Sequence, residues 1–142
     1  QVAAVSSVWE TAPVGYADQP NFLNAAVLLL TQHSAEEICL KAIAEIVRRL
    51  DRVRDPENVN GPRTIDLDLV LFNADTLCVG EHEIPDPDVL TRSFLAIPLA
   101  ELDPGYVHPQ TGQTVSDIAA RFDAERSIMT PRPDVDLSTA IP

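Results

Sequence analysis

The fold is decided by one stretch of the chain, Asn60-Gly61-Pro62-Arg63-Thr64-Ile65-Asp66-Leu67-Asp68-Leu69-Val70-Leu71-Phe72. Its first three residues are a turn signal. The following residues, 65–72, are rich in branched apolar side chains and begin with a period of two, which predicts a β-strand. Alternate residues of a strand share a face, so Thr64, Asp66 and Asp68 are expected on one side and the leucines on the core side.

The two carboxylates of this stretch allow two interpretations. On a strand their Cα atoms lie about 6.6 Å apart, which lets Asp66 and Asp68 flank one or two hard cations. Mg²⁺ is usually held by one or two carboxylates together with substrate phosphates. Alternatively, both are solvated residues on the wet face of a half-buried strand. Aspartate is depleted in strands, so the pattern favours a magnesium site with Arg63 at its mouth.

The composition indicates a single globular domain. The 142 residues, 45% of them hydrophobic, suffice for one core. No apolar run reaches the length of a membrane span, and no secretory signal is visible in the sequence. Cys39 and Cys78 match no metal-binding spacing, so we expect a reduced, cytoplasmic protein.

The charge distribution points to a small polyphosphate rather than to a polymer. The formal net charge of −12 argues against a nucleic-acid or anionic-membrane partner. The chain nonetheless has nine arginines, five of them between residues 48 and 63. Arginine presents a planar fork that grips phosphate oxygens. Arg52 and Arg54, which alternate close to Arg63, are therefore interpreted as phosphate contacts rather than as ordinary surface charge.

Local signals outline the remaining elements. The capping box Ser34-Ala35-Glu36-Glu37 predicts a helix that runs to about Leu50. Asn24 is the one polar side chain in an apolar run, so it needs either a ligand or a backbone partner. The other expected elements are strands at 2–11, 22–31 and 78–84, helices at 88–102 (broken near Pro98) and 114–122, and an extended or mobile tail over 124–142 that follows a domain over 1–123.

The opening stretch, in particular Gly61-Pro62-Arg63-Thr64-Ile65-Asp66-Leu67-Asp68, resembles the signature of the 6-hydroxymethyl-7,8-dihydropterin pyrophosphokinase family of folate biosynthesis. Residues 10–15, 19–27, 52–55, 84–85 and 92–95 are also similar to segments of that family. The resemblance covers about residues 4–122. It implies an α+β fold, a ferredoxin-like sandwich in which helices pack on a mostly antiparallel sheet.

The resemblance also implies a reaction and a role for each matched residue. Pyrophosphate passes from ATP to the hydroxymethyl group of 6-hydroxymethyl-7,8-dihydropterin, which gives AMP and the pterin diphosphate. Asp66 and Asp68 would hold two Mg²⁺ ions and, with Arg54 and Arg63, would form the catalytic set. ATP would be bound by Arg52, Arg54, Arg63 and Arg92. The implied pterin slot consists of Thr11, Ala12, Val14, Phe22, Asn24 and Phe94, with Asn24 reading the ring edge between two phenylalanines.

The chain departs from the family pattern in several places. The family begins with a strand, a Gly-Ser-Asn turn and a helix, which these 142 residues lack. We therefore expect either a longer product or another segment or subunit, such as a fused folate-pathway enzyme, beside this chain. Val47, Asp51 and Asp86 stand where the family usually has an acid, a glycine and a histidine.

Two alternative functions remain open at this level. One is a degenerate, non-catalytic family member that binds nucleotide or pterin, or that serves as an interaction module. The other is a metal-dependent phosphotransferase with a different heteroaromatic acceptor.

Overall fold

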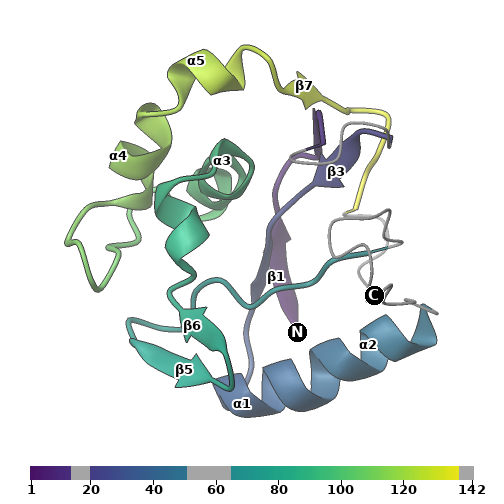
Figure 1. The fold of residues 1–142 in the computed structure, drawn as a ribbon, viewed down its shortest axis with the longest axis vertical. Coiled ribbons are helices and arrows are strands. Elements are labelled where there is room, and N and C mark those ends of the chain that lie inside the picture. The colour runs from purple at the N-terminus through teal and green to yellow at the C-terminus, as the bar shows by residue number, and fades with distance from the viewer. Residues whose placement is uncertain (14–19, 51–64, 138–142) are drawn as a thin grey trace.

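The computed structural model describes residues 1–13, 20–50 and 65–137. Figure 1 shows helices and short strands around a bent hairpin, with the long helix at one end of the molecule and the C-terminal helices beside the hairpin. The strand pairs are antiparallel. The fold is therefore α+β, as predicted.

The hairpin is a long ribbon that bends in the middle. Its strands are β1 (Val2–Val5), β2 (Trp9–Thr11), β3 (Phe22–Asn24) and β4 (Val27–Leu29), with β1 paired to β4 and β2 paired to β3. At the bend, Ser6 N donates to Ala26 O at 2.9 Å, and Ser6 Oγ accepts from Ala26 N at 2.8 Å. Each of the two predicted strands is thus present as two short strands. At the bend between them, the backbone and the side chain of Ser6 make the hydrogen bonds to Ala26.

The long helix follows the hairpin. It consists of α1 (Ala35–Glu37), a π-helical segment η1 (Ile38–Ile43) and α2 (Ala44–Arg49), which run on without a break. The capping box is present in full, since Ser34 Oγ accepts from Glu37 N at 3.2 Å and Glu37 Oε2 accepts from Ser34 N at 3.2 Å. The predicted helix is confirmed at both ends.

The predicted strand over residues 65–72 is wrong, although its alternation is confirmed. Asp66 and Asp68 are exposed, whereas the residues between and around them are half-buried. No residue of 65–72 belongs to a strand in the described part of the chain. A strand requires a hydrogen-bonded neighbour, and none of the described strands supplies one. Leu69 and Phe72, farther along the stretch, pack against a small apolar cluster.

The C-terminal half is mainly helical. Its elements are β5 (Leu77–Val79), β6 (His82–Ile84), the 3₁₀ helix η2 (Pro87–Leu90), α3 (Ser93–Leu102), α4 (Val115–Ala120), α5 (Asp123–Arg126) and β7 (Thr130–Pro131). The strands β5 and β6 pair with each other, and β7 pairs with β2. The predicted domain boundary at residue 123 stays a prediction.

One predicted interruption is corrected, because α3 continues through Pro98. A proline inside a helix costs about 3 kcal/mol through the lost hydrogen bond and the ring clash. Ala96, Ile97 and Pro98 are all buried. Their burial offsets this cost, which the local sequence does not reveal.

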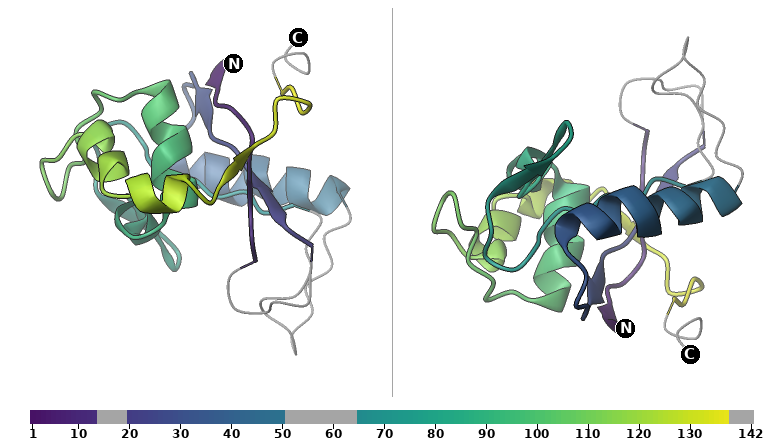
Figure 2. Two further views of the ribbon diagram at one scale, coloured as in Figure 1. Left: turned by 90° about the horizontal axis from the view of Figure 1, so that it is seen from above. Right: turned by 90° about the horizontal axis from the view of Figure 1, so that it is seen from below.

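Two apolar clusters hold the described part together. The larger one joins β2 to the C-terminal helices, and the smaller one joins the start of the long helix to the β5–β6 hairpin; Figure 2 shows both groups of elements from two further sides. The buried members of the larger cluster are Trp9, Ala96, Ile97, Ile118, Ala119 and Met129, and those of the smaller one are Ala35, Val79 and Ile84.

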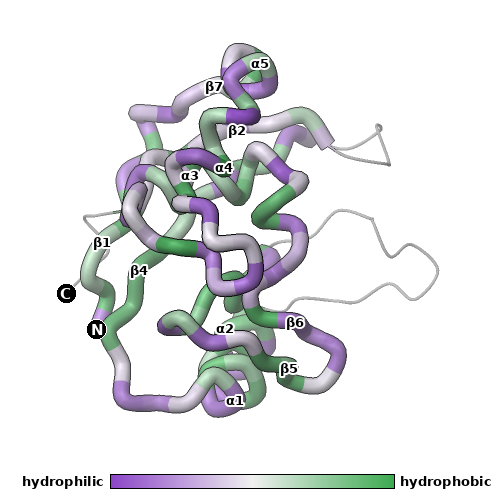
Figure 3. Tube along the Cα trace, turned by 90° about the vertical axis from the view of Figure 1, so that its left-hand side faces the viewer, coloured by the Kyte–Doolittle hydropathy of each residue, from purple (hydrophilic) through white to green (hydrophobic). Residues whose placement is uncertain are grey.

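Apolar side chains also remain on the surface. Leu29 and Leu30, in and after β4, are 45% and 62% exposed, and Leu40 on the long helix is 61% exposed. Figure 3 shows β4 as one of the most hydrophobic segments of the trace. Among the described helices, none has the length and apolar character that would let it cross a membrane.

Candidate active site

The paired strands β2 and β3 bring three residues of the predicted pterin slot onto one face. Thr11 lies opposite Phe22, and Trp9 lies opposite Asn24. Residues opposite each other and two apart on antiparallel strands share a face. Asn24 Nδ2 donates to Thr11 Oγ1 at 2.9 Å and makes a longer contact of 3.4 Å with Trp9 O. The polar residue in the apolar run therefore has an internal partner that is itself a predicted slot residue.

A pocket of about 330 Å³ lies where β2 ends and α3 begins. Four predicted site residues line it: Thr11 and Ala12 from the strand, and Arg92 and Phe94 from the start of the helix. Its volume is at the small end of the range for ligand pockets, about 300–1,000 Å³. Phe22 and Asn24 lie on the adjacent strand β3 but do not line the pocket.

The C-terminal segment supplies the opposite wall, which the sequence analysis missed. The lining residues from this segment are Phe122, Glu125, Ile128 and Met129. Residues 124–142 carried no periodic pattern. The one local signal was the adjacent apolar pair Ile128 and Met129 within a polar stretch. Of these two, Met129 is 6% exposed and packs in the core with Trp9.

Arg92 stands at the entrance of α3. Arg92 is the N-cap residue of the helix, and its Nε lies 3.7 Å from Asp88 Oδ1. The side chain of Arg92 is 42% exposed. An exposed ion pair of this length is weak, so the guanidinium can turn toward an anionic ligand at little cost.

One of the two acids, Asp68, lies near the long helix. Burial raises the pKa of the Cys39 thiol, and the negative charge of Asp68 raises it further. This relation places Asp68 close to η1. In the described part of the chain no group of three or more acidic, histidine or cysteine side chains is arranged to hold a metal. Asp66 and Asp68 therefore stay predicted ligands of Mg²⁺, an ion that is usually held by one or two carboxylates together with waters and substrate phosphates.

Several predicted site residues lie outside the described residues. They are Val14, Arg52, Arg54 and Arg63, together with the atypical Asp51. Asp86, one of the predicted departures from the family pattern, has a local structural role. Its Oδ1 accepts from Asp88 N at 2.8 Å and caps η2.

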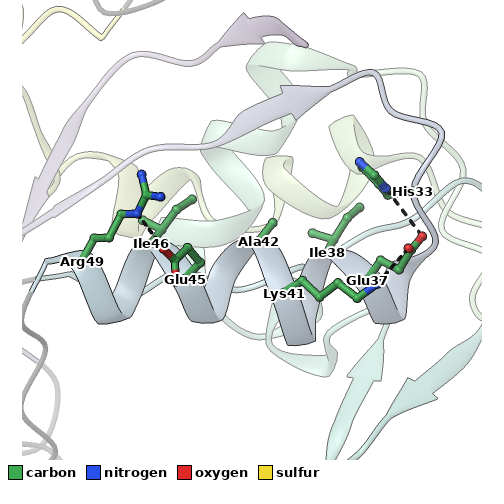
Figure 4. A pocket seen from close by; sticks show the side chains of 8 residues that line it. All are labelled: His33, Glu37, Ile38, Lys41, Ala42, Glu45, Ile46 and Arg49. Carbon is green, nitrogen blue, oxygen red and sulfur yellow. Dashed lines mark hydrogen bonds and ion pairs between the residues drawn. The ribbon is translucent and has the colours of Figure 1, made fainter.

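A second hollow, about 460 Å³, runs along the long helix and contains none of the predicted site residues. It is lined by His33, Glu37, Ile38, Lys41, Ala42, Glu45, Ile46 and Arg49. Figure 4 shows that its charged side chains pair with one another along the helix, with Glu45 Oε1 2.7 Å from Arg49 Nε and Glu37 Oε1 3.2 Å from Lys41 Nζ. These are exposed pairs within one helix, which stabilise it only slightly.

The fold and the site define an α+β protein with a small pocket between a hairpin and a helix N-terminus. A sequence model of the family described as 7,8-dihydro-6-hydroxymethylpterin-pyrophosphokinase (HPPK) matches residues 1–104. The chain belongs to this family. The predicted resemblance is confirmed.

Individual relatives agree. A 2-amino-4-hydroxy-6-hydroxymethyldihydropteridine pyrophosphokinase of Bacillus subtilis is 42% identical over 101 residues, which cover 71% of this chain and 59% of that protein. The enzyme of the same name from Methylorubrum extorquens is 37% identical over 126 residues, or 87% of this chain and 75% of that protein. The folic acid synthesis protein fol1 of Schizosaccharomyces pombe is 38% identical over 128 residues, which are 88% of this chain but 17% of the relative. This chain thus spans about three fifths of the Bacillus relative and a small part of the yeast one.

Proposed function

We propose that this protein transfers pyrophosphate from ATP to the hydroxymethyl group of 6-hydroxymethyl-7,8-dihydropterin in cytoplasmic folate biosynthesis, and that its whole fold is a ferredoxin-like sandwich. The family match over residues 1–104 supports the activity. The structural observation that supports the proposal is the pocket that Thr11, Ala12, Arg92 and Phe94 line together. Segments about 80 residues apart in sequence, both within the family match, meet there.

The pterin would lie against the face formed by β2 and β3. Phe22 and Phe94 offer apolar ring faces for a flat heteroaromatic ring. Asn24 would read the ring edge, because an amide offers both donors and an acceptor. Its hydrogen bond to Thr11 Oγ1 orients the amide before substrate arrives. Val14 completes the proposed slot.

ATP and two Mg²⁺ ions would occupy the other half of the site. Asp66 and Asp68 would hold the ions, and Arg52, Arg54, Arg63 and Arg92 would hold the phosphates. When bound, Mg²⁺ neutralises phosphate charge and orients the oxygens. The hydroxymethyl oxygen would form a bond to the β-phosphorus of ATP and lose its proton to solvent, while the bond between the β-phosphorus and the oxygen that bridges to the α-phosphate breaks and this oxygen leaves with AMP. The products are AMP and the pterin diphosphate. Positioning and electrostatic stabilisation dominate such transfers.

The relatives also support a proposal about partners. The chain matches 15–17% of the lengths of three folic acid synthesis proteins, including those of Schizosaccharomyces pombe and Dictyostelium discoideum. We propose that this domain is fused to, or associates with, another folate-pathway enzyme.

The direct test is to incubate the protein with ATP, Mg²⁺ and the hydroxymethyl dihydropterin, and to measure AMP and pterin diphosphate. We expect both products in equal amounts, and none without the pterin. A protein that binds ATP or pterin but forms no AMP at any enzyme concentration is a binding module instead. AMP formation with a different heteroaromatic alcohol alone would identify another acceptor.

A further inference from the structure

Helix α3 contacts β2 at two points, two helical turns apart. Phe94 and Glu101 are separated by seven residues, so they lie on the same face of the helix. Phe94 lines the pocket together with Thr11 and Ala12. At the other end, Glu101 Oε1 accepts from Trp9 Nε1 at 2.8 Å, and Glu101 Oε2 accepts from Ser7 N at 2.7 Å.

These contacts set the helix antiparallel to the strand. Residues 94 and 101 are about 10.5 Å apart along a helix axis, and Ser7 and Thr11 are about 13 Å apart along an extended chain. The two spans are similar. A carboxylate bound at one end of the strand therefore determines where Phe94 stands against Thr11 at the other end.

The anchor point of this carboxylate is well packed. Glu101 itself is exposed, but the Trp9 ring that it holds is 9% exposed and belongs to the larger core cluster. Arg126 lies over the same ring, with its guanidinium carbon 5.5 Å from the centroid. Trp9 also lies opposite Asn24 in the β2–β3 register. Hydrogen bonds from neutral donors to a carboxylate are stronger than those to neutral acceptors.

We propose that Glu101 is a positioning residue for the pterin slot. It touches no substrate. It fixes α3 against β2, and in this way it determines the distance between Phe94 and Thr11 and the position of Asn24, which lies opposite Trp9. Its loss would weaken pterin binding and leave ATP binding nearly unchanged. This inference rests on the proposed function, because it concerns the acceptor half of that site.

The test compares variants by their KM for the pterin, their Kd for ATP and their melting temperature. We expect Glu101→Ala to raise the pterin KM about fivefold, a shift typical of losing one or two hydrogen bonds, with the ATP Kd unchanged within about twofold. Glu101→Gln retains one acceptor and should give a smaller rise. Trp9→Phe removes the indole N–H donor together with part of the buried ring, so it is judged in the double variant: the part of its effect on the pterin KM that passes through Glu101 should not add to that of Glu101→Ala. Trp9 is the single tryptophan, and its fluorescence reports the loss of the contact directly.

Thr114→Ala is the matched stability control. Thr114 Oγ1 accepts from Asp117 N and caps α4 away from the pocket, and loss of such a cap costs about 1 kcal/mol. This variant should lower the melting temperature without changing the pterin KM. If Glu101→Ala does not fold, the inference requires that Glu101→Gln and Trp9→Phe show a raised KM for the pterin.

Two results overturn the inference while the function stands: an active wild type whose folded Glu101 and Trp9 variants keep its pterin KM, or variants that weaken ATP and pterin equally. If the wild-type protein forms no AMP and binds no pterin, the proposed function is rejected, and the inference is rejected with it.

Discussion

At the residue scale, single side chains carry most of the chemistry that the sequence predicts. Asp66 and Asp68 keep their exposed positions even though the strand around them is absent. The donor set therefore survives the correction of the secondary structure, because side-chain alternation depends on what the neighbouring leucines bury and not on a paired backbone. Asn24, which the sequence predicted to need a partner, donates a hydrogen bond to Thr11 Oγ1.

The proposed metal role gives the first prediction. Asp68→Asn keeps the shape of the side chain but removes its charge, so we expect turnover to fall about a hundredfold or more. The measurement is AMP formation over a range of Mg²⁺ concentrations. Glu81→Gln, an exposed acid in the β5–β6 turn, is the control and should retain full activity. Equal turnover of Asp68→Asn and wild type would reject the metal assignment.

The second prediction concerns His108, which is fully buried. Its Nε2 has no hydrogen-bond partner among the residues that the structure describes, and its Nδ1 accepts a long bond of 3.4 Å from Gln110 N. Burial lowers the pKa of His108. When the pKa of a histidine is lower in the folded state than in the unfolded state, the unfolded chain binds the proton at a higher pH. The folded protein therefore becomes less stable as pH falls.

We therefore expect the free energy of unfolding to fall as pH drops below about 6.5 toward the lowered folded pKa, by at most about 1.4 kcal/mol per pH unit from this residue. Urea titrations between pH 8 and pH 5 measure the slope. His108→Leu should flatten it, whereas His82→Gln, at an exposed position of β6, should not. An identical slope in His108→Leu would show that other groups cause the dependence.

At the element scale, the clamp between β2 and the chain after β7 decides where the C-terminal segment lies. Arg132 NH1 donates to Glu10 Oε2 at 2.7 Å, and the same guanidinium holds both oxygens of Asp134 at 2.7 and 2.8 Å. Asn21 Nδ2 donates to the other oxygen of Glu10 at 2.9 Å. Glu10 and Arg132 are 122 residues apart in sequence, so no local pattern predicts their ion pair.

The clamp gives the third prediction. Hydrogen bonds from Asn21 and then Arg132 lower the pKa of Glu10, and the hydrogen bond from Arg132 lowers the pKa of Asp134. Carboxyl groups with lowered folded pKa values stabilise the fold above their unfolded values, near 4, and lose this contribution as pH falls through the folded values.

Arg132→Met should therefore lower the melting temperature at pH 7, and the gap from wild type should shrink below about pH 4. Thermal melts at several pH values measure this. Arg121→Met, at an exposed position after α4, is the control. A gap that does not change with pH would mean that the side chain stabilises the segment by packing alone.

At the scale of the whole molecule, the pocket exists only because distant segments meet. Its walls come from β2, from α3 and from the segment around Met129. The family match ends at residue 104, yet residues 122–129 close the pocket and contribute to the larger core. The C-terminal segment is thus part of the same packing unit as the matched region.

The fourth prediction uses two neighbours in this segment. Met129 is 6% exposed and Ile128 is 80% exposed. Met129→Ala should lower the free energy of unfolding by about 2–5 kcal/mol because it leaves a cavity in the core. Ile128→Ala should change it by less than about 0.5 kcal/mol. Urea denaturation measures both. Equal, small effects would show that the segment does not pack on β2 and α3 in solution.

The sequence by itself determined the features that depend on interactions between residues close together in the chain. The capping box set the start of the long helix, because its hydrogen bonds span three residues, and the alternation around Asp66 and Asp68 set which side chains are exposed. The family signature identified the residues proposed to act on ATP and pterin. Only the tertiary structure decided that α3 continues through Pro98, that residues 65–72 have no strand partner among the described residues, and that the C-terminal segment closes the pocket. Each of these depends on burial or pairing between residues far apart in sequence, which the local pattern does not contain.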